Sequence, residues 1–321
     1  MTTKRWLLSA VLLIILGTIL FSFSACSENG IKGVFLGDYE EKTFEISEDF
    51  DDIYIDIDAT DVNLLISEDD KCHVVAYTQK NINYSVSVED GTLKISHKDD
   101  RKWYEYVNIV LESSSLTVYL PKSEYSALTL RGSTGDVLLS QNFRFESIDM
   151  SVSTGDLNVS ASVTGAVSLK ATTGDIELSD MSSASVYLSI STGDIEVRNV
   201  ACEGDFGFDV RTGDVELKNI TCGNLYSEGS SGNIEMDNVI SSGKMTLERS
   251  TGDISLYACD ATELYIETTT GDVKGVLLTS KIFNTHSSTG KVDVPETTTG
   301  GICKIKVSTG NIIFTIAESL D

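Results

Sequence analysis

The 321-residue sequence is poor in proline, histidine and positive charge. It has two prolines, three histidines, and 24 lysines and arginines against 49 aspartates and glutamates, giving a formal charge of −25. With no basic cluster beyond the first few residues, the chain lacks the cations that bind nucleic-acid phosphates or anionic lipids. We therefore exclude nucleic acid as a partner and expect membrane contact only through an N-terminal anchor. The 41% apolar content is too high for a disordered acidic chain.

The sequence also lacks the local motifs of metal sites and nucleophilic enzymes. It contains no C-x-x-C pair and no G-x-S-x-G turn, and His73, His97 and His286 lie in unrelated contexts. We expect these histidines to be surface residues and predict no catalytic residues and no required cofactor. A polysaccharide-cleaving β-helix is the least favoured alternative, because the stacked carboxylates of any such ladder reach glycosidase spacing without being catalytic.

The N-terminus reads as an export signal. Lys4 and Arg5 precede an apolar run from residue 6 to residue 21, which leads into Ser24-Ala25-Cys26. This resembles a bacterial lipobox, which predicts that Cys26 is lipidated. The alternative is an uncleaved transmembrane anchor over residues 6–25, since 20 residues span a bilayer. Either reading places the chain after a polar linker (27–42) outside the cytoplasm.

A Thr-Gly-Asp turn, or a close variant, recurs through the C-terminal two-thirds of the chain at intervals of 19 or 20 residues. The repeat glycines are Gly135, Gly155, Gly174, Gly193, Gly213, Gly232, Gly252, Gly271, Gly290 and Gly310. Positions seven and five before, and two and four after, each glycine are apolar in 37 of 40 cases; Ser227, Gly275 and Thr285 are the exceptions.

Apolar residues spaced by two are typical of strands, so each repeat predicts two short strands joined by the turn. We predict an all-β fold: a parallel β-solenoid, a single-stranded β-helix expected to be right-handed, with about ten coils of about 19.4 residues. The two prolines, Pro121 and Pro295, fall outside the apolar columns, as a ladder of backbone hydrogen bonds requires.

The remaining segments predict how the rod ends. Strand-like alternation at 43–47, 53–57, 62–66, 82–88, 92–96, 106–111 and 116–120 predicts a β-rich cap with irregular first coils over residues 43–125, before regular repeats over 126–321. Glu89-Asp90-Gly91 predicts a hairpin turn. The chain stops soon after its last repeat, so we expect that repeat to form an uncapped end guarded by charge or by a partner.

Aspartate follows the repeat glycine in seven coils and should form one file along the rod. These residues are Asp136, Asp156, Asp175, Asp194, Asp214, Asp253 and Asp272; Asn233, Lys291 and Asn311 interrupt the file. Like charges about 5 Å apart repel, so the file needs compensation. The favoured explanation is a structural turn in which aspartate accepts local backbone N–H bonds. The alternative is a Ca²⁺ ladder, since calcium takes carboxylate oxygens.

Two further groups are candidate sites. Cys202 and Cys222 both lie nine residues after a repeat glycine on consecutive coils, so they predict either a disulfide or two stacked buried thiols. Trp103, Tyr104 and Tyr106 form the densest aromatic patch. They predict either a partner-binding surface or a strand with one face in the core.

The Ser-Thr-Gly-Asp turns at 133–136, 153–156 and 191–194, with Leu120-Pro121-Lys122 before the first, resemble the bacterial putative-adhesin domain family of unknown function. The resemblance covers residues 43–317 and implies a cell-envelope protein behind an N-terminal anchor. We therefore predict a non-enzymatic interaction protein that presents an acidic solenoid to a protein or glycan partner. An envelope-stress sensor acting through a membrane partner is the alternative.

Overall fold

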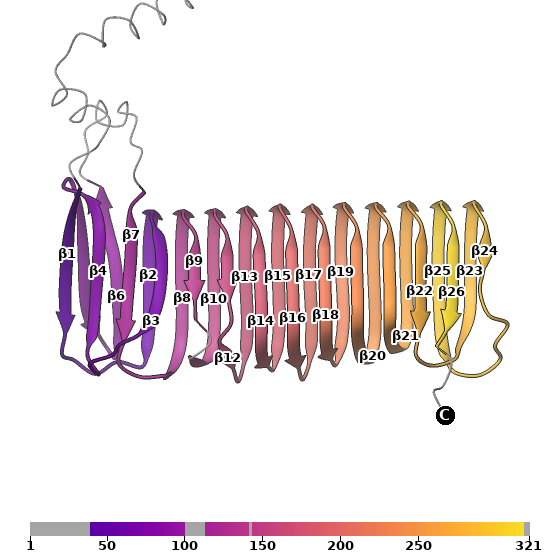
Figure 1. Ribbon diagram of the computed structural model, residues 1–321, viewed down its shortest axis with the longest axis horizontal. Helices are drawn as coiled ribbons and strands as arrows, with labels where there is room; N and C mark the ends of the chain where they lie inside the picture. The colour runs from indigo at the N-terminus through magenta and orange to yellow at the C-terminus, as the bar shows by residue number, and fades with distance from the viewer. Residues whose placement is uncertain (1–38, 100–112, 141–142, 318–321) are drawn as a thin grey trace, which may run out of the picture.

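The computed structural model describes residues 39–99, 113–140 and 143–317. These form an all-β rod in which short strands stack side by side along one axis (Figure 1). At each repeat glycine the chain turns from one face of the rod to the other, and the hydrogen bonds run between consecutive coils. The β-solenoid predicted from the repeat is therefore the fold of the chain.

We call the two sides of the rod face A, which precedes each repeat glycine, and face B, which follows it. Face A of the regular coils contains β8 (Glu124–Thr134), β10 (Arg144–Thr154), β13 (Ala166–Thr173), β15 (Ser185–Thr192), β17 (Asp205–Thr212), β19 (Asn224–Ser231), β23 (Lys281–Thr289) and β25 (Gly301–Thr309). Face B contains β9 (Val137–Leu139), β11 (Leu157–Val159), β14 (Ile176–Ser183), β16 (Ile195–Cys202), β18 (Val215–Cys222), β22 (Val273–Leu277), β24 (Val292–Asp293) and β26 (Ile312–Ile316). The long strands β20 (Ile234–Thr251) and β21 (Ile254–Thr270) bend from face B into face A, and β12 (Ser162–Val163) is a short bridge between coils.

The four apolar columns fill the space between the two faces. Leu188, Val197, Phe208 and Leu217, for example, have no exposed surface. Two of the exceptions are compensated by large neighbours in an adjacent coil. Ser227 pairs with Phe208, and a side chain at Gly275 would meet the ring of Phe314. The core is thus continuous along the rod although its columns are not uniform.

The first coils are built from segments that are not in chain order. β2 (Asp52–Ala59) and β3 (Asp61–Ile66) stack on β8 and β9, and outside them lie β6 (Thr92–Asp99) and β7 (Ser115–Leu120). Antiparallel strands then close this end: β1 (Tyr39–Ile46), β4 (Cys72–Gln79) and β5 (Ile82–Glu89). The predicted turn at 89–91 joins β5 to β6, whereas β4 was not expected and segment 106–111 lies outside the described residues.

The last two repeats also exchange places, which corrects the expected order. β25 and β26 pair with β21 and β22 on one side and with β23 and β24 on the other. In Figure 1 the last strands of the chain accordingly lie inside the strands that precede them in sequence. The end of the rod is therefore the coil of β23 and β24, where Val292 is 42% exposed although it belongs to an apolar column.

Candidate functional site

The aspartates after the repeat glycines form a continuous hydrogen-bonded file, which we call the aspartate ladder. In each case Oδ1 accepts the backbone N–H of the corresponding residue in the next coil, as between Asp175 and Asp194 (2.7 Å) and between Asp194 and Asp214 (2.7 Å). The ladder begins at Asp61, which accepts the N–H of Asp136 (3.1 Å). The bond therefore joins coils, whereas the sequence suggested a bond within one turn.

The two asparagines that interrupt the aspartate ladder keep the same bond. Asn233 accepts the N–H of Asp253 (2.9 Å), and Asn311 accepts that of Lys291 (2.9 Å), so an amide oxygen serves as well as a carboxylate. Only Oδ1 is needed for this role. Within the described residues, no group of three or more histidine, cysteine or acidic side chains is arranged to hold a metal ion. The geometry thus gives each side-chain oxygen of the turn a hydrogen-bond partner, the backbone N–H of the next coil. Whether calcium binds to the ladder is tested by experiment.

A second file, six residues after the repeat glycine, was missed by the sequence reasoning. Its members have left-handed backbone, with φ between 54° and 56°. Each side-chain amide in the file donates to the side-chain oxygen Oδ1 of the corresponding residue in the previous coil. They are Asp180, Asn199, Asn219 and Asn238. The recurrence of aspartate and asparagine at this spacing was the available signal, since both tolerate positive φ better than other side chains.

Cys202 and Cys222 lie on neighbouring, hydrogen-bonded strands, next to the paired residues Ala201 and Thr221. Both are buried, and in this structure both are free thiols. The Cys202 thiol donates to the carbonyl of Asp205 at 3.4 Å. Burial, with a smaller contribution from Cys202, raises the pKa of Cys222 to about 12, which keeps this thiol protonated and unreactive at neutral pH.

The three histidines do not come together. His73 contacts Asp69 at 2.9 Å, and hydrogen bonds from Ser67 and then from His73 lower the pKa of Asp69 to about 2. His97 accepts the backbone N–H of Asp58, and His286 lies on β23 at the opposite end of the rod. Two predicted sites, Cys26 and the aromatics Trp103, Tyr104 and Tyr106, lie outside the described residues. The described residues include no helix long and apolar enough to cross a membrane.

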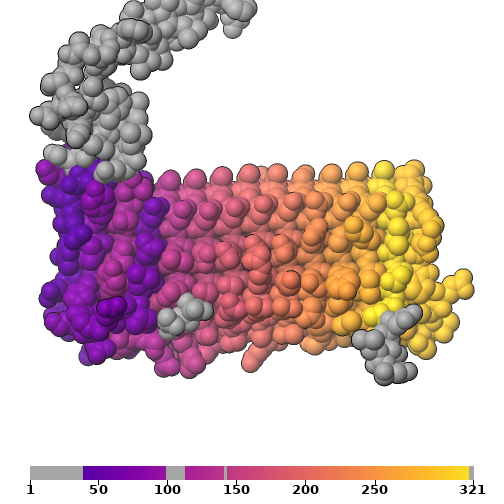
Figure 2. Space-filling view, viewed as in Figure 1, coloured from indigo at the N-terminus to yellow at the C-terminus, as the bar shows by residue number. Residues whose placement is uncertain are grey.

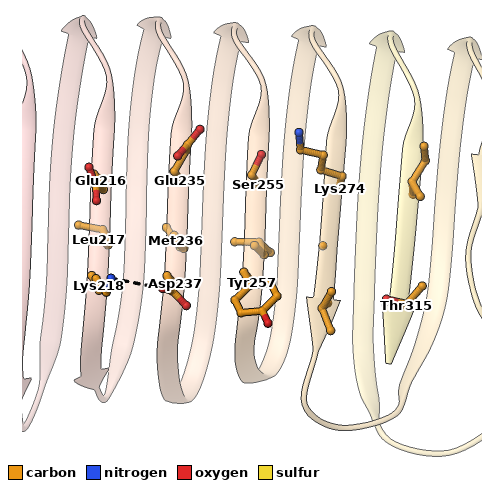
Figure 3. A pocket seen from close by; sticks show the side chains of 14 residues that line it. Glu216, Leu217, Lys218, Glu235, Met236, Asp237, Ser255, Tyr257, Lys274 and Thr315 are labelled. Atoms are coloured by element: carbon orange, nitrogen blue, oxygen red, sulfur yellow. Dashed lines mark ion pairs between the residues drawn. The ribbon is translucent and has the colours of Figure 1, made fainter. Parts of the chain in front are cut away.

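A groove of about 550 Å³ crosses five neighbouring coils on face B (Figure 3). Its side chains form rows because equivalent positions of consecutive coils lie next to each other. One row contains Glu216, Glu235, Ser255 and Lys274, and a parallel row contains Lys218, Asp237, Tyr257 and Thr315. The groove is a consequence of the repeat, since the short side chain of Ser255 lies between longer ones.

Tyr257 is the most exposed large hydrophobic residue of the described chain, with 64% of its surface accessible. The backbone explains its position. Ala258 has φ of 51°, and the pairing of β21 with β22 shifts register between Leu256 and Cys259. Tyr257 itself stays in register with Asp237 of the preceding coil. Ala258 has the left-handed backbone that Asn219 and Asn238 have at the same position of their coils. The ring therefore projects beside the groove because Tyr257 occupies an outward-facing position of its strand.

Charges of both signs surround the ring. Lys218 Nζ lies 3.8 Å from Asp237 Oδ2, while Glu216, Glu235 and Lys274 are exposed at the surface of the groove. An exposed aromatic ring among polar groups is the composition of a protein-binding hot spot with a polar rim. The arrangement can bind a partner but contains no nucleophile paired with a base.

The Toastrack DUF4097 family model matches residues 50–208 and 204–321. No curated protein matches the chain. Solved structures with a similar course include a putative adhesin from Parabacteroides distasonis (14% identity, 85% of this chain and 98% of that chain covered, TM-score 0.48). A putative lipid binding protein from the same species (15%, 88% and 98%, TM-score 0.42) and a putative cell adhesion protein from Clostridium sporogenes (9%, 87% and 100%, TM-score 0.23) are also similar.

Proposed function

Because the chain belongs to the Toastrack DUF4097 family, we propose that it is a non-enzymatic interaction protein, anchored in the cell envelope, that binds a protein or glycan partner outside the cytoplasm. The observation that carries this proposal is the groove on face B with the projecting Tyr257. Tyr257 has 64% of its surface in water, and exposing the apolar ring costs free energy. Contact with a partner would bury the ring and remove that cost.

The charge of the rod supports an interaction role over an enzymatic one. Residues 201–280, which contain most of the groove, carry 14 acidic and five basic side chains. Such a surface attracts partners with complementary positive charge and speeds their encounter at low ionic strength. The aspartate ladder has a structural explanation, since each Oδ1 accepts a backbone N–H of the next coil.

The test is a binding measurement with the full-length chain against two fractions of bacterial envelope, one of proteins and one of protein-free glycan. We expect saturable binding to one fraction, weakened about tenfold or more by Tyr257→Ala. Tyr54→Ala is the matched control, because Tyr54 is an exposed tyrosine (37%) on face A near the other end of the rod. Binding to neither fraction, or equal loss in both variants, would refute the proposal.

The anchor has a separate test. Metabolic labelling with a fatty acid should modify the wild-type chain and not the Cys26→Ser variant. An unlabelled wild type that stays with the membrane would favour the uncleaved transmembrane anchor, whereas a labelled Cys26→Ser variant would place the fatty acid on another residue.

A further inference from the structure

The end of the rod formed by β23 and β24 is an open edge of both faces. Beyond β23 no described strand continues face A, and beyond β24 none continues face B. Core columns that are fully buried elsewhere are uncovered here: Val292 is 42% exposed, and Phe283, Thr285 and Val294 are only half-buried. This end therefore presents unpaired backbone groups together with the open end of an apolar core.

The two ends of the rod differ in how they are protected. At the first end, the edge strand β1 carries three glutamates among eight residues. At the other end, β23 has the sequence KIFNTHSST, in which Lys281 is buried against Asp260 (Nζ–Oδ1, 2.5 Å) and His286 is the remaining titratable side chain. Charge on an edge strand is a common device against edge-to-edge pairing, and β23 lacks it.

The distribution of charge along the rod also favours this end for contact between two copies. Residues 201–280 carry 14 acidic and five basic side chains, so the sides of two rods repel each other. Residues 281–317, which make the last two coils, instead carry four lysines and two acidic residues. The last two coils are thus a stretch of the rod where a second copy would meet little negative charge.

We propose that two copies of this chain associate end to end through β23 and β24. A two-fold axis perpendicular to the rod would pair β23 antiparallel with its copy and bring β24 against its copy at the same time. Both faces would then continue from one rod into the next, and the exposed core residues would be covered. The interface is isologous, so it closes at a dimer.

The size of the end predicts weak association. This end lies at the right of Figure 2, where the loop after β24 projects at the lower corner. A strand of nine residues is about 30 Å long and the faces lie about 10 Å apart, giving roughly 300 Å² per copy. Stable interfaces bury about 800 Å² per partner, so we expect association weaker than that of a standard interface. Many copies on one surface would strengthen such contacts by multivalency.

The experiment measures the oligomeric state of the full-length chain by sedimentation in a density-matched detergent. The edge variant is Asn284→Glu with His286→Glu, which places two carboxylates on the exposed side of β23. The control is Ser153→Glu with Thr172→Glu, which adds the same charge at exposed positions of interior coils. We expect a monomer–dimer equilibrium in the wild type and control, and at least a tenfold weaker dimer in the edge variant.

A cross-linking arm fixes the geometry. A His286→Cys chain treated with a short bis-maleimide should give covalent dimers above the wild-type background, whereas a Ser153→Cys chain should not. A wild type that stays monomeric up to about 1 mM, an edge variant that dimerises as the wild type does, or growth beyond the dimer by head-to-tail stacking would each overturn the proposal. These variants leave the face B groove unchanged, so the outcome is independent of the proposed partner binding.

Discussion

Replacing Arg249 by methionine tests the packing of the rod's interior. Arg249 is 4% exposed and lies three residues before a repeat glycine, in a column where the neighbouring coils place Val210, Thr268 and Val307. Its Nη1 donates to the carbonyl of Val210 at 3.2 Å, whereas Nε and Nη2 have no partner. The guanidinium fits only because Gly229 has no side chain, since a Cβ there would overlap Nη1.

The expected effect of Arg249→Met is a gain in stability. An unpaired buried polar group costs about 1–3 kcal/mol, and two of them disappear in the variant. The loss of the bond to Val210 offsets about 1 kcal/mol or more, while methionine keeps much of the apolar contact of the arginine stem. A net gain of about 2 kcal/mol follows, which corresponds to a rise in Tm of about 4 °C for a chain of this size.

Thermal unfolding of the full-length chain measures this effect, with Arg211→Met as the control because Arg211 is exposed in the neighbouring column. The control should change stability by less than about 0.5 kcal/mol. Burial lowers the pKa of Arg249 to about 10, so its charged form destabilises the folded state below that pH. The gap between wild type and Arg249→Met should therefore narrow as the pH rises through 10. A Tm that falls in Arg249→Met alone would show that the guanidinium has a stabilising partner, and would refute the reasoning.

Four further predictions concern the repeat. Gly193→Ala should unfold at a much lower temperature than Gly91→Ala, although both glycines have positive φ, because only at Gly193 would a Cβ overlap the carbonyl of the preceding coil's glycine. Asp194→Ala with Asp214→Ala should lower stability by about 1–2 kcal/mol in a denaturant titration. The double asparagine variant should stay near wild type, because an amide oxygen keeps the bond between coils. A glycan-cleaving activity lost in the alanine variant would contradict the non-enzymatic role. Calcium and magnesium at equal ionic strength should give the same Tm, since the ladder is satisfied by backbone N–H groups; a calcium-specific rise would make it a metal ladder. Hydrogen exchange should be slower in β26 than in β23, because β26 has a neighbour on both sides and β23 on one; equal rates would contradict the exchanged order of the last coils.

The sequence predicted the coil because the apolar columns of the repeat are the positions that point into the interior of the rod. A position such as Leu188 or Leu217 faces the same environment in every coil, so the period of the apolar residues reveals both the strands and the turn. The aspartate ladder was visible for the same reason, although its hydrogen-bond partner was not, because a partner one coil away is adjacent in space and about 20 residues distant in sequence.

What the sequence did not reveal depends on particular neighbours. The groove on face B depends on Ser255 and Tyr257, which stand in outward rows where neighbouring coils place charged side chains. The buried Arg249 occupies a column that was not read as core, and its accommodation depends on Gly229 one coil away. A search for periodicity detects the positions that all coils share. It therefore finds the repeat and misses the sites that deviate from it.

The exchanged order of the last two coils shows the same limit and has a physical advantage. Every coil carries the same strand pattern, so backbone pairing alone does not choose which coil follows β21 and β22. Side-chain fit does: the ring of Phe314 fills the space left by Gly275, whereas chain order would place the smaller Val294 there. In the observed order β25 is held between two coils, and the outermost coil is joined to the rod at both of its ends, so opening that coil frees a closed loop.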